Sequence, residues 1–83
     1  MARNLGPIRV NAICPGFIQG EWLRKGMGDD MYNAALKNLT EKTPLGLTVT
    51  PEQVAQGIYS FIETNKVVTG ETMLMDGGHH LII

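Results

Sequence analysis

The sequence predicts an α/β fold built around a βαβ unit of two parallel strands, and three stretches carry that prediction. Residues 8–13 are rich in β-branched side chains and lie between Gly-Pro and a nearby Pro-Gly, which is typical of a short strand. Residues 51–64 carry the capping residues and the apolar stripe of a helix. Residues 67–75 are rich in valine, threonine and apolar side chains, which predicts a second strand. Two parallel strands joined by a crossover form a right-handed unit.

The first strand also predicts where a binding site lies. Only Arg9 and Asn11 interrupt its apolar character, as expected of a parallel strand covered on both faces, and both should find local hydrogen-bond partners. Cys14 is expected to be a buried, inert thiol, because no cationic side chain is obvious near it. Pro15 lacks an N–H group and ends the ladder, and Gly16 allows a tight turn or the close approach of a ligand. Ligands of open α/β sheets bind beyond the carboxyl ends of the strands, so we expect a site here.

The middle of the chain shows no single period over its whole length. Residues 21–25 are expected to form one helical turn within a loop that contains several glycines. Asp29-Asp30 predicts the N-cap of a helix over residues 31–42, and residues 43–49 are expected to form a connector. The apolar face of that helix should contain Met31, Ala35, Leu36 and Leu39.

The helix over residues 51–64 has the clearest start signal in the chain. Thr50 at the N-cap, Pro51 at the first helical position and Gln53 two positions later together form a capping box. The helix should present one apolar stripe, made of Val54, Ile58, Phe61 and Ile62.

The remaining segments carry weaker signals. Residues 1–6 are expected to be the end of a helix, with Gly6 as its stop signal. Gly70 should form a turn or bulge within the second strand, and residues 76–83 an apolar tail. His79-His80 lies in that tail without a third ligand at metal-binding spacing, so tail histidines are favoured over a metal site.

Length and composition favour a globular protein that depends on a partner. The chain has 83 residues, 43% of them hydrophobic, and ten glycines. A chain of this length buries only about 60–65% of its unfolded surface and is marginally stable alone. Its single cysteine cannot form an internal disulfide, so neither a disulfide nor a metal is expected to stabilise it.

Charge and hydropathy exclude several classes of partner. The net charge is −1 and the basic residues are scattered, so neither nucleic acid nor an anionic membrane surface is expected as a partner. No apolar run is long enough to span a membrane, and the first residues lack the apolar core of a signal peptide. We therefore expect a cytoplasmic protein.

Four ordered segments of the chain carry a resemblance to a known family. They are Ile-Arg-Val-Asn-Ala-Ile-Cys-Pro-Gly-Phe-Ile (8–18), Thr-Pro-Leu-Gly (43–46), Thr-Pro-Glu-Gln-Val-Ala (50–55) and Val-Thr-Gly-Glu-Thr-Met-Leu-Met-Asp-Gly-Gly (68–78). Together they resemble the C-terminal third of the short-chain dehydrogenase/reductase family. The resemblance implies that residues 1–83 are a partial NAD(P)-binding domain of the Rossmann type, a doubly wound sheet. Residues 8–13 and 67–75 would be its last two strands, and residues 17–49 would be its substrate lid.

The resemblance also implies a cofactor contact. The loop formed by Pro15, Gly16, Phe17 and Ile18 is similar to the loop that lies along the nicotinamide ring of NAD or NADP. The backbone N–H and C=O groups at Ile18 would hold the carboxamide and fix the ring face presented. Gly20 occupies a position where family members often carry threonine, so a hydroxyl contact is missing here. The alternative is an ordinary loop that ends a strand.

Substrate contacts are expected from the lid, above all from Trp22, with Leu23 and Met27 beside it. Flexible methionine and flat aromatic side chains suit an apolar substrate, but they suit lid packing equally well. Met31 and Tyr32 lie in the same segment, and the same two interpretations apply to them.

The family's catalytic motifs are missing from these residues. No glycine-rich phosphate-binding pattern occurs, and the residues four positions after Tyr32 and Tyr59 are leucine and glutamate, so there is no Tyr-x-x-x-Lys. No catalytic residue is therefore predicted within the chain.

Two hypotheses follow from this combination of features. In the first, the chain is the C-terminal segment of an NAD(P)-dependent oxidoreductase acting on alcohols or ketones, including 3-oxoacyl carriers. It would then supply the nicotinamide-side loop, the substrate lid and an oligomer face. In the second, it acts alone as a non-catalytic interaction module or self-associating remnant, because an unpaired strand edge recruits another chain. The expected partner is the N-terminal part of the enzyme or a second copy, with a homo-oligomer as the assembled form.

Overall fold

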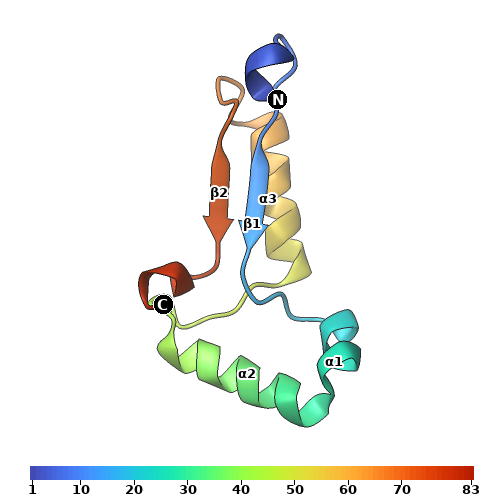
Figure 1. Ribbon diagram of the computed structural model, residues 1–83, viewed down its shortest axis with the longest axis vertical. Coiled ribbons are helices and arrows are strands. Elements are labelled where there is room, and N and C mark those ends of the chain that lie inside the picture. The colour runs from blue at the N-terminus through green and yellow to red at the C-terminus, as the bar shows by residue number, and fades with distance from the viewer.

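The α/β fold class is confirmed by a computed structural model that describes residues 1–83. Two short strands and one helix form one end of the molecule, and two helices lie across the carboxyl ends of the strands at the other end (Figure 1). The elements are a 3₁₀ turn at Ala2–Asn4, β1 at Ala12–Pro15, α1 at Glu21–Met27, α2 at Asp29–Lys42, α3 at Pro51–Glu63, β2 at Thr72–Met75 and a 3₁₀ turn at His79–Leu81.

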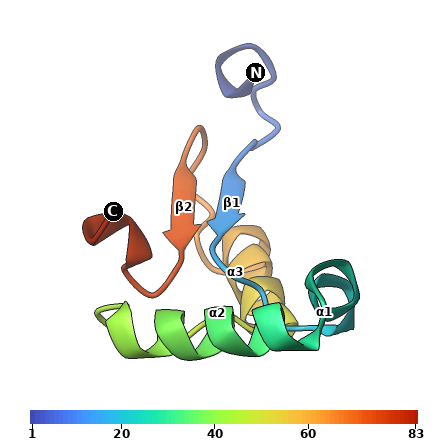
Figure 2. The same ribbon diagram turned by 60° about the horizontal axis from the view of Figure 1, so that its bottom comes forward.

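The two strands pair in parallel and leave one face of the sheet open. Ala12 lies opposite Thr72, and Cys14 lies opposite Leu74. All four residues are exposed, because successive side chains of a strand alternate between faces and no element covers this one (Figure 2). Cys14 is an exposed free thiol, so the prediction that it is buried was wrong.

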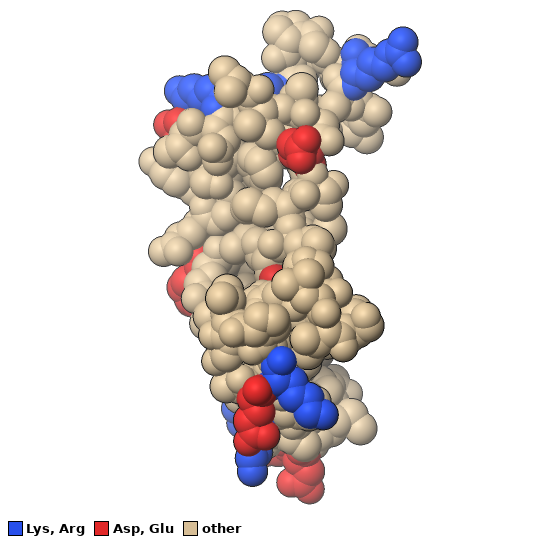
Figure 3. All heavy atoms as spheres, turned by 90° about the vertical axis from the view of Figure 1, so that its left-hand side faces the viewer, with Lys and Arg blue, Asp and Glu red and all other residues tan.

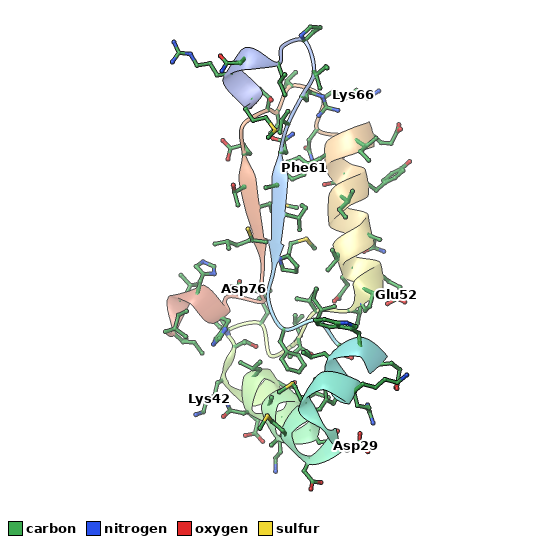
Figure 4. All side chains as sticks on the ribbon, turned by 45° about the vertical axis from the view of Figure 1, so that its right-hand side comes forward. Asp29, Lys42, Glu52, Phe61, Lys66 and Asp76 are labelled. Atoms are coloured by element: carbon green, nitrogen blue, oxygen red, sulfur yellow. The ribbon has the colours of Figure 1, made fainter.

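The other face of the sheet packs against α3. Ile13, Met73 and Met75 are half-buried on this face. Gly57 of α3 is buried there, and a Cβ atom at this position would collide with the Met75 sulfur. Figure 4 shows the ring of Phe61 directed from α3 toward the strands. The helix lies close to the sheet because it carries a glycine at the point of contact.

The capping box of α3 is confirmed, and its apolar stripe is only partly covered. The Gln53 N–H donates to the Thr50 hydroxyl at 3.2 Å, and the Thr50 N–H donates to the Gln53 side-chain oxygen at 2.9 Å. Ile58 remains 46% exposed and Ile62 57% exposed, because the two-stranded sheet is too narrow to cover the stripe.

β1 begins four residues later than expected, and Arg9 shows why. Arg9 does not lie within the strand. Its guanidinium group donates to the carbonyl oxygens of Phe61 at 2.7 Å and Asn65 at 3.0 Å. These carbonyls belong to the end of α3 and the turn after it, where helix carbonyl groups lack intrahelical partners and a cation is favoured. The hydrogen-bond partners of Arg9 were expected to be local, but they are distant in sequence.

Asn11 holds the segment before β2 in the same way. Its side chain donates to the Val68 carbonyl at 3.0 Å and accepts from the Glu71 N–H at 3.0 Å. β2 begins only at Thr72, because Gly70 adopts a left-handed conformation (φ +76°) and turns the chain. Residues 67–71 therefore form a turn rather than the first half of the predicted strand.

The two helices of the predicted lid, α1 and α2 (the lid helices), differ from the prediction in their starts and in their buried face. α1 extends over seven residues rather than one turn. α2 starts at Asp29, which lies in its first turn, because Gly28 at φ +85° occupies the cap. Met31 is 62% exposed and Tyr32 is buried in its place. At the amino terminus, Gly6 is not left-handed, so it does not form the predicted helix stop.

The molecule is elongated and buries little of its surface. Its extents are 47 × 26 × 20 Å and its radius of gyration is 15.2 Å, against about 12 Å for a compact domain of this length. The accessible surface is 6043 Å², against about 4,900 Å² for a monomer of this mass. On the side of β2, the middle of the molecule shows few charged side chains (Figure 3). None of the helices combines the length and apolar composition that a membrane crossing requires.

Candidate functional site

The loop after β1 starts at a close contact between the two strand ends. The Gly16 N–H donates to the Met75 carbonyl at 3.0 Å. A Cβ atom on Gly16 would lie 2.8 Å from Cβ of Asp76 and 3.0 Å from its Cα. Glycine is therefore needed here by the sheet itself, since any side chain would push the two strand ends apart.

Ile18 lies at the centre of the loop with its own polar groups free. The Val49 N–H donates to the Phe17 carbonyl at 3.0 Å, and the Gln19 N–H donates to the Val49 carbonyl at 2.8 Å. In such a parallel bridge, the N–H and C=O of the middle residue point to the opposite side. Neither group of Ile18 has a hydrogen-bond partner in the molecule.

A cavity of about 440 Å³ lies along this loop and the start of α1. It brings together most of the residues predicted to bind cofactor and substrate, together with Pro51 of α3. The residues that line it are Gly16, Phe17, Ile18, Gln19, Gly20, Glu21, Trp22, Leu23 and Pro51.

Two of the predicted site residues lie outside this cavity. Pro15 ends β1 and does not line it. Met27 lies at the far end of α1, where it borders a separate surface hollow with Trp22 and Leu23. Trp22 borders both hollows, and 87% of its surface is exposed.

Sequence analysis left substrate contact and lid packing open for Tyr32, which does not line the cavity and instead braces the loop from the side of α2. Its hydroxyl accepts a hydrogen bond from the Gly20 N–H at 3.1 Å, and its ring lies 5.6 Å from that of Phe17. The Arg24 guanidinium lies over the Tyr32 ring, 4.8 Å from its centroid. The helical period of α2 favoured Met31 for this position, and no local signal distinguishes the two.

The family model described as enoyl-(acyl carrier protein) reductase matches residues 1–80 of the chain. The chain belongs to the short-chain dehydrogenase/reductase family. It is 38% identical over 85 residues to the enoyl-[acyl-carrier-protein] reductase [NADH] of Bacillus cereus, covering 99% of this chain and 32% of the relative. It is 40% identical over 73 residues to the 3-oxoacyl-[acyl-carrier-protein] reductase of Chlamydia muridarum, covering 86% and 27%.

A solved structure gives the same assignment. A small-chain dehydrogenase in complex with NADPH superposes with a TM-score of 0.84 at 36% identity, covering 96% of this chain and 36% of that one. The chain therefore spans about a third of the length of the family members that it matches.

The turn after β2 contacts the connector between α2 and α3. The Leu45 N–H donates to the Gly77 carbonyl at 3.0 Å. Gly78 lies so close to Pro44 that a Cβ atom would come within 2.9 Å of the proline ring. Connector and turn are thereby held together.

Asp76 organises this turn through its carboxylate. The carboxylate accepts from the Gly78 N–H at 3.0 Å and the His80 N–H at 2.9 Å, and it pairs with the His80 ring nitrogen at 2.9 Å. Burial raises the pKa of Asp76, but the hydrogen bonds from His80 and Gly78 outweigh it and leave the pKa below its usual value. His80 is therefore engaged with a carboxylate, and no group of three metal-ligating side chains is present.

The residues of the loop fit one part of a nicotinamide dinucleotide. A carboxamide needs one hydrogen-bond donor and one acceptor, and Ile18 offers both at the wall of a cavity with apolar sides. A pyrophosphate would need a glycine-rich turn at a helix N-terminus, which these residues do not contain. The chain is therefore suited to the nicotinamide side of the cofactor alone.

Proposed function

We propose that this chain is the C-terminal third of an NAD(P)-dependent short-chain oxidoreductase. It supplies the nicotinamide-side loop and the substrate lid, and the remainder of the enzyme supplies the phosphate-binding turn and the catalytic Tyr-x-x-x-Lys. The observation that carries the proposal is the free N–H and C=O pair of Ile18 at the cavity wall. An unpaired donor and acceptor on a half-buried loop suit a ligand that provides both partners.

Each residue of the loop and lid has a distinct task in this proposal. When bound, the reduced nicotinamide supplies the hydride. Ile18 binds the carboxamide, which fixes the face of the ring that meets the substrate. Trp22 and Leu23 cover the cavity from α1 and contact the acyl portion of the substrate. The names of the two bacterial relatives indicate acyl thioesters, so we propose a 3-oxoacyl or enoyl thioester as the substrate class.

The exposed apolar surfaces are contact areas in the assembled enzyme. The open face of the sheet, with Cys14 and Leu74, is covered by the N-terminal part of the enzyme. The exposed stripe of α3, with Ile58 and Ile62, contributes to a homo-oligomer interface. The excess of accessible surface over that of a compact monomer supports both assignments.

Complementation tests the proposal. The chain is co-expressed with the part of the Bacillus cereus relative that it does not match, and the pair is assayed for co-purification and for NADH oxidation with an enoyl or 3-oxoacyl thioester. We expect the two parts to associate and to restore hydride transfer that neither shows alone.

Ile18→Pro tests the role of the free N–H group in the same assay. Proline removes the free N–H without removing any internal hydrogen bond, since the Ile18 N–H makes none. We expect this variant to associate normally and to transfer little or no hydride. A folded homo-oligomer that neither binds the other part nor responds to dinucleotide would contradict the proposal and favour a stand-alone interaction module.

A further inference from the structure

Tyr32 is the one buried residue of the two lid helices, with 3% of its surface exposed. Its side chain contacts the loop as well as Arg24 of α1. The hydroxyl accepts from the Gly20 N–H at 3.1 Å, and the ring packs against Phe17 with a 44° tilt. The tyrosine therefore connects α2 to both ends of the segment that contains Ile18.

The loop is held from two sides, and Ile18 lies between them. On one side, Val49 pairs with the residues before and after Ile18, as described above. On the other side, Tyr32 holds Phe17 through its ring and Gly20 through its hydroxyl. This bracing fixes the position of the backbone N–H and C=O groups of Ile18, although Tyr32 itself does not line the cavity.

Arg24 holds the tyrosine ring in turn. Its guanidinium carbon lies 4.8 Å from the ring centroid, within the range of a cation–π contact. The same guanidinium group lies 3.8 Å from a carboxylate oxygen of Asp29, and its Nε lies 3.8 Å from one of Glu21. The ring is therefore fixed by side chains from both lid helices.

We propose that Tyr32 is a positioning residue for the nicotinamide, acting through Gly20 and Phe17 on the polar groups of Ile18. This inference rests on the proposed function. The tyrosine hydroxyl fixes this end of the loop, because it is the hydrogen-bond partner of the Gly20 N–H. The contact also couples the lid to the cofactor loop, because a movement of α2 that displaces Tyr32 releases the Gly20 N–H.

The experiment compares Tyr32→Phe with Tyr59→Phe in the complemented enzyme. Tyr59 lies on α3 with 61% of its surface exposed, and its hydroxyl has no hydrogen-bond partner, so its variant controls for the loss of a tyrosine hydroxyl. Two dissociation constants are measured for each protein, that of NADH or NADPH and that of the matching ADP-ribose, which lacks the nicotinamide. Amide hydrogen exchange at Gly20 is measured by NMR in the same preparations.

We expect Tyr32→Phe to weaken NAD(P)H binding about three- to tenfold, the worth of one neutral hydrogen bond, with ADP-ribose binding unchanged. Exchange of the Gly20 amide should accelerate in this variant and stay at the wild-type rate in Tyr59→Phe. Equal weakening of both ligands would assign Tyr32 a purely structural role and overturn the inference. Faster exchange at Gly20 without any change in NAD(P)H affinity would overturn it as well. If the wild type binds ADP-ribose as tightly as NAD(P)H, the nicotinamide adds nothing to binding and the proposed function itself fails.

Discussion

The lid end of the molecule and its sheet differ in how much of their surface they bury. Of the five buried residues, Tyr32, Thr43, Thr48 and Val49 lie in the lid and its connector, and only Gly57 lies beside the sheet. The sheet has two short strands and one uncovered face. The part of the chain that forms the candidate site is thus packed by itself, whereas the sheet has a face that this chain leaves uncovered.

Polar contacts account for much of this difference. The Thr43 hydroxyl donates to the Leu47 carbonyl at 3.0 Å and accepts from its N–H at 3.2 Å. The Gln19 side chain donates to the Thr48 hydroxyl at 2.7 Å. Such bonds are needed in this connector, because its buried threonine hydroxyls would be costly without partners. A site that is braced in this way is preorganised for a ligand even while the sheet is incomplete.

The largest effect should come from a methyl group added at the strand ends. Gly16→Ala places a Cβ atom against the backbone and Cβ of Asp76, which cannot move without separating the strands. We expect this change to lower the free energy of unfolding by about 2 kcal/mol, the typical cost of overpacking, as measured by urea denaturation.

Gly57→Ala is the matched change at the contact between α3 and the sheet. Its methyl group meets only the flexible ends of Met75 and Met73, and alanine gains helix propensity over glycine. We expect a change of less than about 1 kcal/mol in the free energy of unfolding. Equal costs for the two substitutions would contradict the contrast between a rigid contact at the strand ends and an adaptable contact with methionine side chains.

The sequence predicted what depends on local chemistry. The capping residues Thr50 and Gln53 placed α3, because their bonds lie within four residues of each other. The Pro-Gly pair placed the loop after β1 for the same reason. The position of Tyr32 could not be predicted, because the partners of its side chain lie on another segment, and neighbouring α2 residues have a similar helical pattern.

A second, smaller effect is expected at the amino end of the sheet. Arg9→Met removes the guanidinium bonds to the end of α3 while keeping an aliphatic stem. We expect the free energy of unfolding to fall by about 1–2 kcal/mol, because carbonyl groups at a helix C-terminus lose a cationic donor. Arg3→Met, at an exposed residue whose side chain makes no hydrogen bond, serves as the control and should be neutral. Equal effects of the two changes would show that Arg9 does not hold this end.

Arg9 also illustrates why the strand bounds were mispredicted. A lone arginine in an apolar run suggests an interrupted strand, and nothing nearby indicates that it reaches a helix more than 50 residues away. The exposure of Cys14 has a related cause, since the sequence pattern describes a strand covered on both faces and the chain covers only one.

The smallest effect should be a change in how stability depends on pH. The pKa of Asp76 lies below its usual value of 3.8, so the carboxylate stabilises the fold fully above that pH. This contribution is lost as the pH falls through the lower pKa of the folded state. We expect the melting temperature of Asp76→Asn to depend less on pH between about 2 and 5 than that of the wild type. Glu71→Gln, which removes a carboxylate without a hydrogen bond, should keep the wild-type slope, and a flattened slope in both would contradict this account.

Protection of the Ile18 amide tests the central claim most directly. Hydrogen exchange at this N–H is followed by NMR in the complemented enzyme under three conditions: without ligand, with ADP-ribose and with NAD(P)H. The Ile18 N–H has no partner within the chain, so we expect fast exchange alone and with ADP-ribose, and marked slowing only with the intact dinucleotide. If Ile18 is already protected alone, or if ADP-ribose slows its exchange as much as NAD(P)H does, this loop is not the nicotinamide-binding loop.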